Sequence, residues 1–228
     1  PYTTLFRSRL EKALEQFPHR KNVELVWHSY ELDPSLPKKT GTQSIYSYFA
    51  KKFAMSEDEA RRTQAKVAQM AKGVGLDYDF DNLVVVSTSD ALRLVKLAKE
   101  SGLGTEAEEV LFDAYFVKGR NISDPAVLVQ LGTSIGLQET EILAMLDSDK
   151  YLSEIKKDIE YSENELGLEY IPFYLFNNKQ VVQGSIPVED YLKVLNEAYA
   201  DWEGSGVSSE KGEVISGQSC SIDGVCSL

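Results

Sequence analysis

Residues 170–179, YIPFYLFNNK, decide the fold that this sequence predicts. The β-rich run 170–176 is typical of a strand, the letters NNK that follow are typical of a tight turn, and Val181-Val182 fits a partner strand. Gly184 breaks the hairpin, and residues 187–202 have the apolar spacing of an amphipathic helix. We therefore expect a β-hairpin followed directly by a helix in this part of the chain.

Upstream of the hairpin the pattern changes to a long helical block. Residues 105–158 are almost purely helical in their spacing, and Asp124-Pro125 supplies an N-cap with a proline at the first helical position. Further upstream, Ser56 and Glu59 form a capping box that predicts the start of another helix. These local signals predict several consecutive helices and no strand of comparable length between them.

The N-terminal part predicts one further helix and one further strand. Residues 9–17 have helical spacing and end at Pro18, whereas residues 23–32 are β-rich and alternate between apolar and polar side chains. The order is then helix, strand, helical block, hairpin, helix. This order favours an α/β fold in which helices are inserted between two sheet-forming halves.

Composition excludes several classes of protein. The chain has 228 residues and a net charge of −12, which argues against binding to nucleic acid or to an anionic membrane surface. No apolar run approaches the roughly 18 residues needed to span a bilayer, and no signal-peptide pattern is present. We expect a cytoplasmic globular protein that needs no cofactor, while its oligomeric state stays open.

Four stretches of the chain together carry a family resemblance: RLEKAL at residues 9–14, WHSYELDP at 27–34, AYFVKGRNISDP at 114–125, and IPFYLFNNK at 171–179. They resemble the corresponding stretches of the DsbA-type thioredoxin-like thiol–disulfide oxidoreductases, in their FrnE-like branch. The resemblance implies an α/β fold with a thioredoxin-like sheet and a large helical insertion. Its expected domain covers residues 9–203, with the insertion at approximately 42–166, and residues 204–228 are expected to form a flexible tail that carries a cysteine pair.

The chain departs from this family at its primary site. The first strand and the Cys-x-x-Cys motif are missing, and counting back from Leu10 places both cysteines at or before residues 1–8. Those eight residues, PYTTLFRS, match the translation of a common sequencing-adapter sequence, so we expect an N-terminal truncation. The alternative is a natural homologue that has lost its redox site. The hydroxyls of Thr3, Thr4 and Ser8 have no basic partner in the sequence that would make them nucleophiles.

The resemblance assigns roles to two residues of the hairpin. Pro172 corresponds to the cis-proline that faces the family's cysteine pair, and Ile171 before it would offer its backbone to substrate. The alternative is a trans proline on an edge strand.

The tail pair Cys220 and Cys226 is the only source of thiol chemistry in the sequence. Asp223-Gly224 predicts a turn that lets the two sulfurs meet, and some FrnE-like proteins carry a second, C-terminal pair. Three interpretations remain open: an auxiliary redox pair, half of a zinc site, or a tail without function. No metal site is expected, since His19 and His28 are far away in sequence and His28 fits a packed or surface histidine.

Three functions compatible with these features remain. The first is a protein dithiol–disulfide oxidoreductase by family, inactive at its primary site in this chain, with protein or small-molecule thiols and disulfides as partners. The second is a non-catalytic thioredoxin-fold module that holds extended peptide beside Pro172 by backbone pairing. The third is a glutathione-dependent isomerase-type relative with a single Ser or Cys at the helix start.

Overall fold

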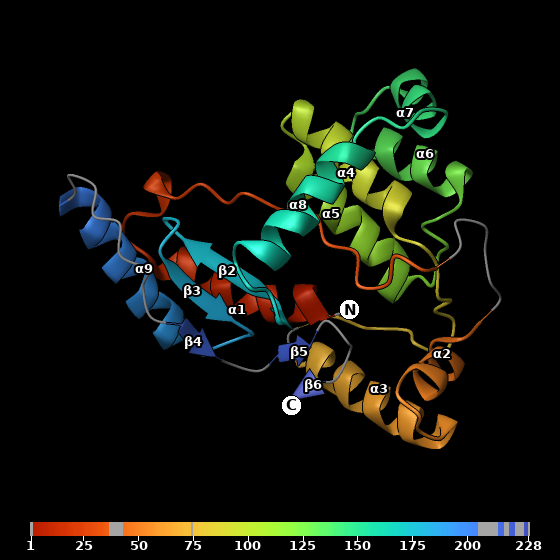
Figure 1. Ribbon diagram of the computed structural model, residues 1–228, viewed down its shortest axis with the longest axis horizontal. Helices are drawn as coiled ribbons and strands as arrows, with labels where there is room; N and C mark the ends of the chain where they lie inside the picture. Colours follow the sequence, from red (N-terminus) through yellow and green to blue (C-terminus); the bar gives the residue numbers. More distant parts are fainter. Residues whose placement is uncertain are drawn as a thin grey trace. The chain divides into compact units, whose positions relative to one another are not determined.

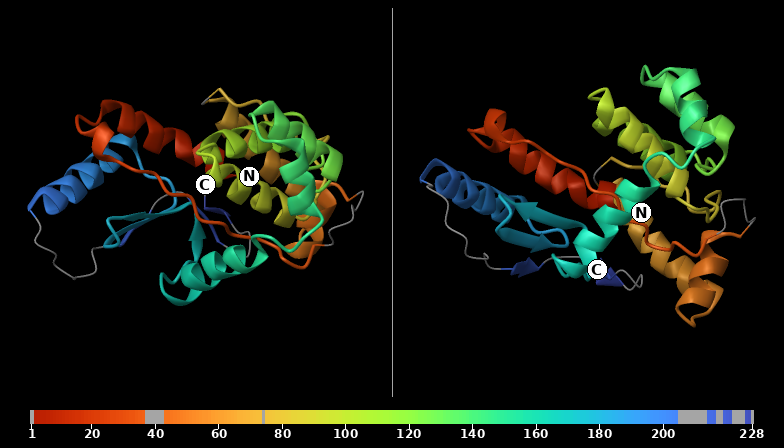
Figure 2. Two further views of the ribbon diagram at one scale, coloured as in Figure 1. Left: turned by 90° about the horizontal axis from the view of Figure 1, so that it is seen from above. Right: turned by 45° about the horizontal axis from the view of Figure 1, so that its top comes forward.

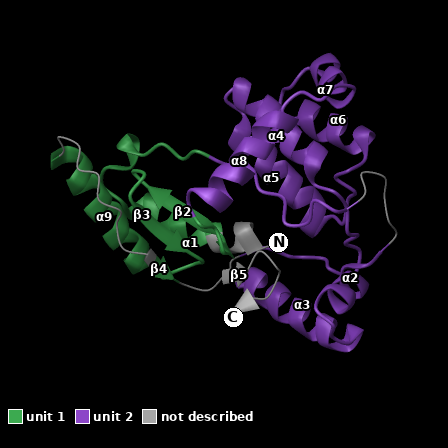
Figure 3. Ribbon diagram, in the orientation of Figure 1, with its two compact units in different colours: residues 1–26, 167–228 green, residues 27–166 purple. Residues whose placement is uncertain are grey.

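The computed structural model describes residues 2–36, 43–73, 75–204, 214–216, 219–221 and 226–227. The described chain divides into two compact units, one formed by residues 1–26 and 167–228 and the other by residues 27–166 (Figure 3). The second unit begins upstream of the insertion that the sequence predicts at 42–166, and it ends at the same residue. No described helix has both the length and the apolar character needed to cross a membrane.

The first unit combines two long helices with two small sheets. Its elements are α1 (Tyr2–Gln16), η1 (Arg20–Asn22), β1 (Tyr170–Ile171), β2 (Phe173–Phe176), β3 (Gln180–Gln183), α9 (Val188–Gly204), β4 (Val214–Ser216), β5 (Ser219–Ser221) and β6 (Cys226–Ser227). One sheet has the order β2-β3-β4, in which β2 and β3 are antiparallel and β4 runs parallel to β3. The other has the order β1-β5-β6, with both pairs antiparallel.

Helices α1 and α9 lie side by side (Figures 1 and 2) and share a core with the hairpin. The buried side chains of this core come from α1 and the residue after it, from β3 and the segment after it, and from α9: Leu10, Ala13, Phe17, Val182, Ile186, Tyr191, Val194 and Leu195. The apolar spacing that predicts the two helices is therefore the spacing of the side chains they bury together.

The second unit is helical. Its elements are α2 (Ile45–Lys52), α3 (Glu57–Lys72), α4 (Ser89–Glu100), α5 (Gly104–Phe112), the π-helical turn η2 (Asp113–Val117), α6 (Pro125–Ser134), α7 (Glu139–Leu146) and α8 (Leu152–Asn164). Its largest core gathers around α4, with buried side chains from α5, α6 and α7, and an isolated bridge joins Ser44 to Val84.

The predicted helix starts agree with the structure. The Ser56 hydroxyl accepts from the Glu59 N–H, and the Glu59 carboxylate accepts in return from the Ser56 N–H, which completes the capping box of α3. The Asp124 side chain accepts from the Ala126 N–H at 2.8 Å, with Pro125 in the first turn of α6.

The prediction of a strand over residues 23–32 is wrong. These residues form no strand, because no described strand pairs with them and an extended segment without a ladder partner has no inter-strand hydrogen bonds. Within the helical unit, their backbone polar groups bind side chains instead: the Lys99 ammonium donates to Trp27 O at 2.7 Å, and the Ser29 N–H donates to Asp158 at 2.8 Å. The first part of the segment, residues 23–26, is exposed, with Val26 at 54%, whereas Ser29 is buried.

Candidate functional site

The predicted proline lies at the junction of the two small sheets. β1 ends at Ile171, the Ile171–Pro172 peptide bond is cis, and β2 begins at Phe173. Pro172 is buried, and its carbonyl accepts from the Gly184 N–H at 2.7 Å, which closes the base of the β2–β3 hairpin. Gly184 has a φ of +82°, a value that favours glycine, so the residue that breaks the hairpin also holds the proline.

Two helices hold the segment that follows this closure. The Arg9 guanidinium on α1 donates to the Ser185 carbonyl at 3.4 Å and reaches its hydroxyl at 3.5 Å. From α9, the Tyr191 hydroxyl donates to the Gly184 carbonyl at 3.3 Å. The proline junction is therefore supported by contacts to both long helices of the first unit, and these contacts fix its backbone.

The two tyrosines beside this junction are neutral. The rings of Tyr174 and Tyr191 meet edge to face, with centroids 5.7 Å apart. Burial raises the pKa of Tyr191 to about 12, and burial, with the neighbouring Tyr191, raises the pKa of Tyr174 well above its ordinary value of 10.0. Both phenols stay protonated at neutral pH and cannot serve as general bases there.

The strand pairing brings the predicted site residues together. Within the first unit, β1 pairs with β5 so that Ile171 lies opposite Cys220, and β5 pairs with β6 so that Cys220 lies opposite Cys226. Directly opposed residues of antiparallel strands have Cα atoms about 4.5–5.5 Å apart. That separation falls within the roughly 4.4–6.8 Å that a disulfide requires. The backbone register is thus compatible with a Cys220–Cys226 disulfide one residue pair away from the proline junction.

The remaining sequence candidates are His19, His28, the turn at Asp223-Gly224 and the hydroxyls near the N-terminus. The turn expected at Asp223-Gly224 and the side chains of Thr3 and Thr4 fall outside the described residues. His19 stacks on Tyr199 with ring centroids 3.9 Å apart. Among the described residues, no group of three or more His, Cys, Asp or Glu side chains could hold a metal ion.

His28 belongs to a polar cluster of the second unit. Its Nδ1 lies 3.1 Å from the Asp158 carboxylate, which also accepts from the Ser29 N–H at 2.8 Å and from the Lys96 ammonium at 2.5 Å. Burial by itself raises the pKa of Asp158, but the hydrogen bonds from these three donors outweigh it and hold that pKa well below its ordinary value of 3.8. The cluster ties the extended segment to α4 and α8, so His28 has a structural role as a surface histidine.

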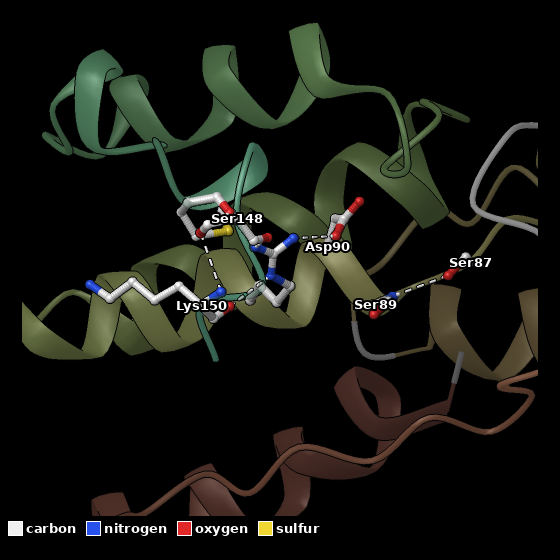
Figure 4. A network of polar contacts seen from close by, with 7 residues as sticks. Ser87, Ser89, Asp90, Ser148 and Lys150 are labelled. Carbon is white, nitrogen blue, oxygen red and sulfur yellow. Dashed lines mark hydrogen bonds and ion pairs between the residues drawn. The ribbon is translucent and has the colours of Figure 1, made fainter. Parts of the chain in front are cut away.

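Sequence reasoning missed the most buried charge of the second unit. The Arg93 side chain on α4 is 1% exposed and donates to the Asp90 carboxylate at 2.8 Å, to the Lys150 carbonyl at 2.8 Å, and to the carbonyls of Met145 and Ser148. Figure 4 shows Asp90, Ser148 and Lys150 of this network. The helical spacing could have indicated that position 93 is buried. It lies four residues before the buried Leu97, on the same face of the helix.

Comparison with known proteins agrees with this geometry. Residues 1–196 match the family of DSBA-like thioredoxin domains. The chain is similar to the crystal structure of a probable DsbA oxidoreductase from Streptomyces coelicolor, with a TM-score of 0.83 and 30% identity, covering 100% of this chain and 94% of the other. It is also 22% identical over 198 residues to the uncharacterized protein YwbO of Bacillus subtilis, covering 86% of this chain and 91% of that protein. The helical insertion between the two parts of the first unit, the proline junction and the extent of these matches lead to one assignment: the chain belongs to the family of DSBA-like thioredoxin domains.

Proposed function

We propose that this chain is a thiol–disulfide oxidoreductase of the FrnE-like branch that lacks the primary Cys-x-x-Cys and carries Cys220 and Cys226 as an auxiliary dithiol. The observation that carries the proposal is the strand register, which sets Cys220 opposite both Ile171 and Cys226. In the reaction, a thiolate of the pair attacks a substrate disulfide and forms a mixed disulfide, which the second thiolate resolves. The pair is oxidised to a disulfide, and the substrate is reduced to two thiols.

The primary site of the family would stand at the start of the first helix. There the helix dipole and unpaired N–H groups lower the pKa of a cysteine, so that a thiolate forms near neutral pH. None of residues 1–219 is a cysteine, so this chemistry is absent from the sequence given. Pro172 and Ile171 would still present their backbone groups to a substrate beside the start of the first helix.

An open sheet edge supports the idea that a further strand belongs beside β2. Among the described strands, β2 pairs only with β3. Its sequence is a continuous apolar run, Phe173 to Phe176. Such a run is typical of a strand that is covered on both faces within a sheet. All four residues are nevertheless only half-buried. The first strand expected for the family would pair at this edge.

A second candidate function is a non-catalytic module that holds extended peptide. The observation in its favour is that β1 already pairs with an extended segment, β5, at Tyr170 and Ile171. In both functions the partners are proteins or small molecules that carry thiols or disulfides, or an extended chain. A cytoplasmic location stays a prediction from the sequence.

Thiol chemistry separates the two functions. We expect the full chain, treated with oxidised glutathione, to lose both free thiols without forming covalent dimers, and to accelerate the reduction of insulin by dithiothreitol. The Cys220→Ser/Cys226→Ser variant should give only the uncatalysed rate, while Cys226→Ser alone should trap a mixed disulfide with glutathione. Equal turnover by the double variant would refute the redox role of the pair, and two free thiols after oxidation would refute the pairing itself.

A further inference from the structure

The edge of β1 beside Pro172 is occupied by the chain's own tail. In the described residues β1 pairs only with β5, through Tyr170 opposite Ser221 and Ile171 opposite Cys220. Tyr170 is 41% exposed and Ile171 is half-buried, so the pairing uses a strand at the surface. A short surface strand with unpaired backbone groups is the kind of edge to which an extended peptide adds.

The tail is anchored just before it reaches this edge. β4 runs parallel to β3 with Val182 opposite Ile215, and Ile215 packs against the core shared by α1, β3 and α9. Only two positions, 217 and 218, separate the end of β4 from the start of β5. A short tether of this kind gives a local concentration on the order of millimolar or more.

We propose that the hairpin β5–β6 is an internal ligand of the β1 edge, which it holds against extended peptides from other molecules, and that a Cys220–Cys226 disulfide strengthens this hold. The backbone part of the inference goes beyond the proposed function and is independent of turnover; the disulfide part rests on the proposed pairing of Cys220 with Cys226. Two residue pairs supply few hydrogen bonds, each worth little in net terms, so the contact is reversible. An external peptide that competes for the β1 edge must therefore overcome the high local concentration of the tethered hairpin, and not a tight contact.

The disulfide acts by organising the hairpin before it binds. A bond between the two opposed cysteines holds β6 against β5 and removes unpaired conformations of the tail that cannot reach β1. The step needs an oxidant, for which a low-molecular-weight disulfide such as oxidised glutathione suffices. The two protein thiols lose two electrons and two protons, one protein disulfide forms, and the small disulfide is cleaved to two thiols.

Amide hydrogen exchange of the full chain tests the backbone pairing. Prolines at both positions flanking Cys220, Ser219→Pro/Ser221→Pro, keep both cysteines and remove N–H donors from β5. Consecutive residues of an antiparallel strand point their N–H groups to opposite sides, so one of Tyr170 and Ile171 donates to β5. We expect exchange of that amide, resolved by NMR, to become roughly tenfold faster in this variant. The matched control Ser209→Pro, upstream of β4, should leave its rate unchanged. An unchanged rate in the double-proline variant would overturn the proposal.

Redox state and a peptide supplied in trans complete the test. Exchange of the β1 amide that donates to β5 should be several-fold slower in the oxidised chain than in the reduced chain, and insensitive to redox state in Cys220→Ser/Cys226→Ser. Equal rates in the oxidised and reduced chain overturn the disulfide part. A fluorescein-labelled, oxidised peptide of residues 218–228 should bind the double-proline variant at least tenfold more tightly than the wild-type chain. If the peptide binds the double-proline variant and the wild-type chain equally, or binds neither of them, the proposal that the hairpin is an internal ligand is overturned. This holds even where the chain reduces insulin.

Discussion

Replacing Arg93 tests which interactions hold the helical unit together. The guanidinium joins α4 to the segment between α7 and α8, where helix α7 ends and leaves carbonyl groups without helical partners. A cation at this end also complements the negative pole of the helix dipole. Removal of the side chain therefore breaks an ion pair and takes the guanidinium donor away from the carbonyls of Ser148 and Lys150.

The contacts of Arg93 determine how much stability its replacement should cost. Truncating one partner of a buried, hydrogen-bonded ion pair costs about 3–5 kcal/mol, and each hydrogen bond to a charged group contributes about 1.5–3 kcal/mol. Met145 O keeps a donor, because it also accepts from the Ser148 hydroxyl at 3.0 Å, so the carbonyls of Ser148 and Lys150 carry most of the loss. We expect Arg93→Ala to lower the free energy of unfolding by about 3–5 kcal/mol. Arg93→Lys should cost about 1–2 kcal/mol, because it keeps the charge but not the planar fork.

Thermal unfolding followed by circular dichroism measures these changes. For a unit of this size the loss in Arg93→Ala corresponds to a fall in Tm of roughly 10 °C or more. The matched control is Lys156→Ala, because the Lys156 side chain is 76% exposed and pairs with Glu160 on the same helix, so its change should stay within about 0.5 kcal/mol. Arg93→Met keeps volume without donors and should fall between Lys and Ala. A Tm of Arg93→Ala within 2 °C of the control, or of Arg93→Met equal to wild type, would refute the reasoning that the donors matter.

Two further predictions concern the same unit. Because the folded pKa of Asp158 lies below its unfolded value, the stability that this carboxylate contributes is fully present above about pH 4 and is lost as the pH falls through the folded pKa. Asp158→Asn should therefore lower Tm at pH 7 and flatten its decline between about pH 5 and 2; parallel curves for the variant and the wild type would contradict this. Gly132→Ala should destabilise by about 1–3 kcal/mol in urea unfolding, because a Cβ on Gly132 would lie 2.5 Å from Ile142 Cδ1 and 3.1 Å from Leu94 Cδ1. Gly204→Ala, where a Cβ meets nothing within 4 Å, is the control, and equal midpoints for the two variants would show that the packing can relax.

The sequence predicted the helices well because their signals are local. Ser56 and Glu59 contact each other across a single turn, and Asp124 caps the turn that it begins, so neither depends on distant parts of the fold. The same holds for the β2–β3 hairpin, whose turn residues Asn177 and Asn178 both have positive φ, a backbone conformation that asparagine tolerates. The fold class followed from the order of these elements.

The strands depended on partners that the sequence pattern cannot specify. Residues 23–32 alternate as a strand should, but the structure describes no partner for them, and polar side chains from α4 and α8 bind part of their backbone. In the tail the opposite happened: residues 214–216, 219–221 and 226–227 have little strand signal, yet each pairs with a neighbour. Arg93 was missed for the same reason, because the carbonyls that it binds lie more than fifty residues away.

The expectation of one strand over residues 170–176 shows how the candidate site arises. The structure divides this run at Pro172 into β1 and β2, which pair in different sheets. Proline has no N–H for a ladder, so the run cannot continue as one evenly paired strand through this position. β2 therefore pairs with the hairpin partner β3, whereas β1 is left to pair with a segment that arrives from elsewhere in the first unit, and that segment contains Cys220. The only cysteines of this sequence thus reach the proline junction through strand pairing, and a substitution that blocks this pairing should separate thiol chemistry from the junction while leaving the β2–β3 hairpin intact.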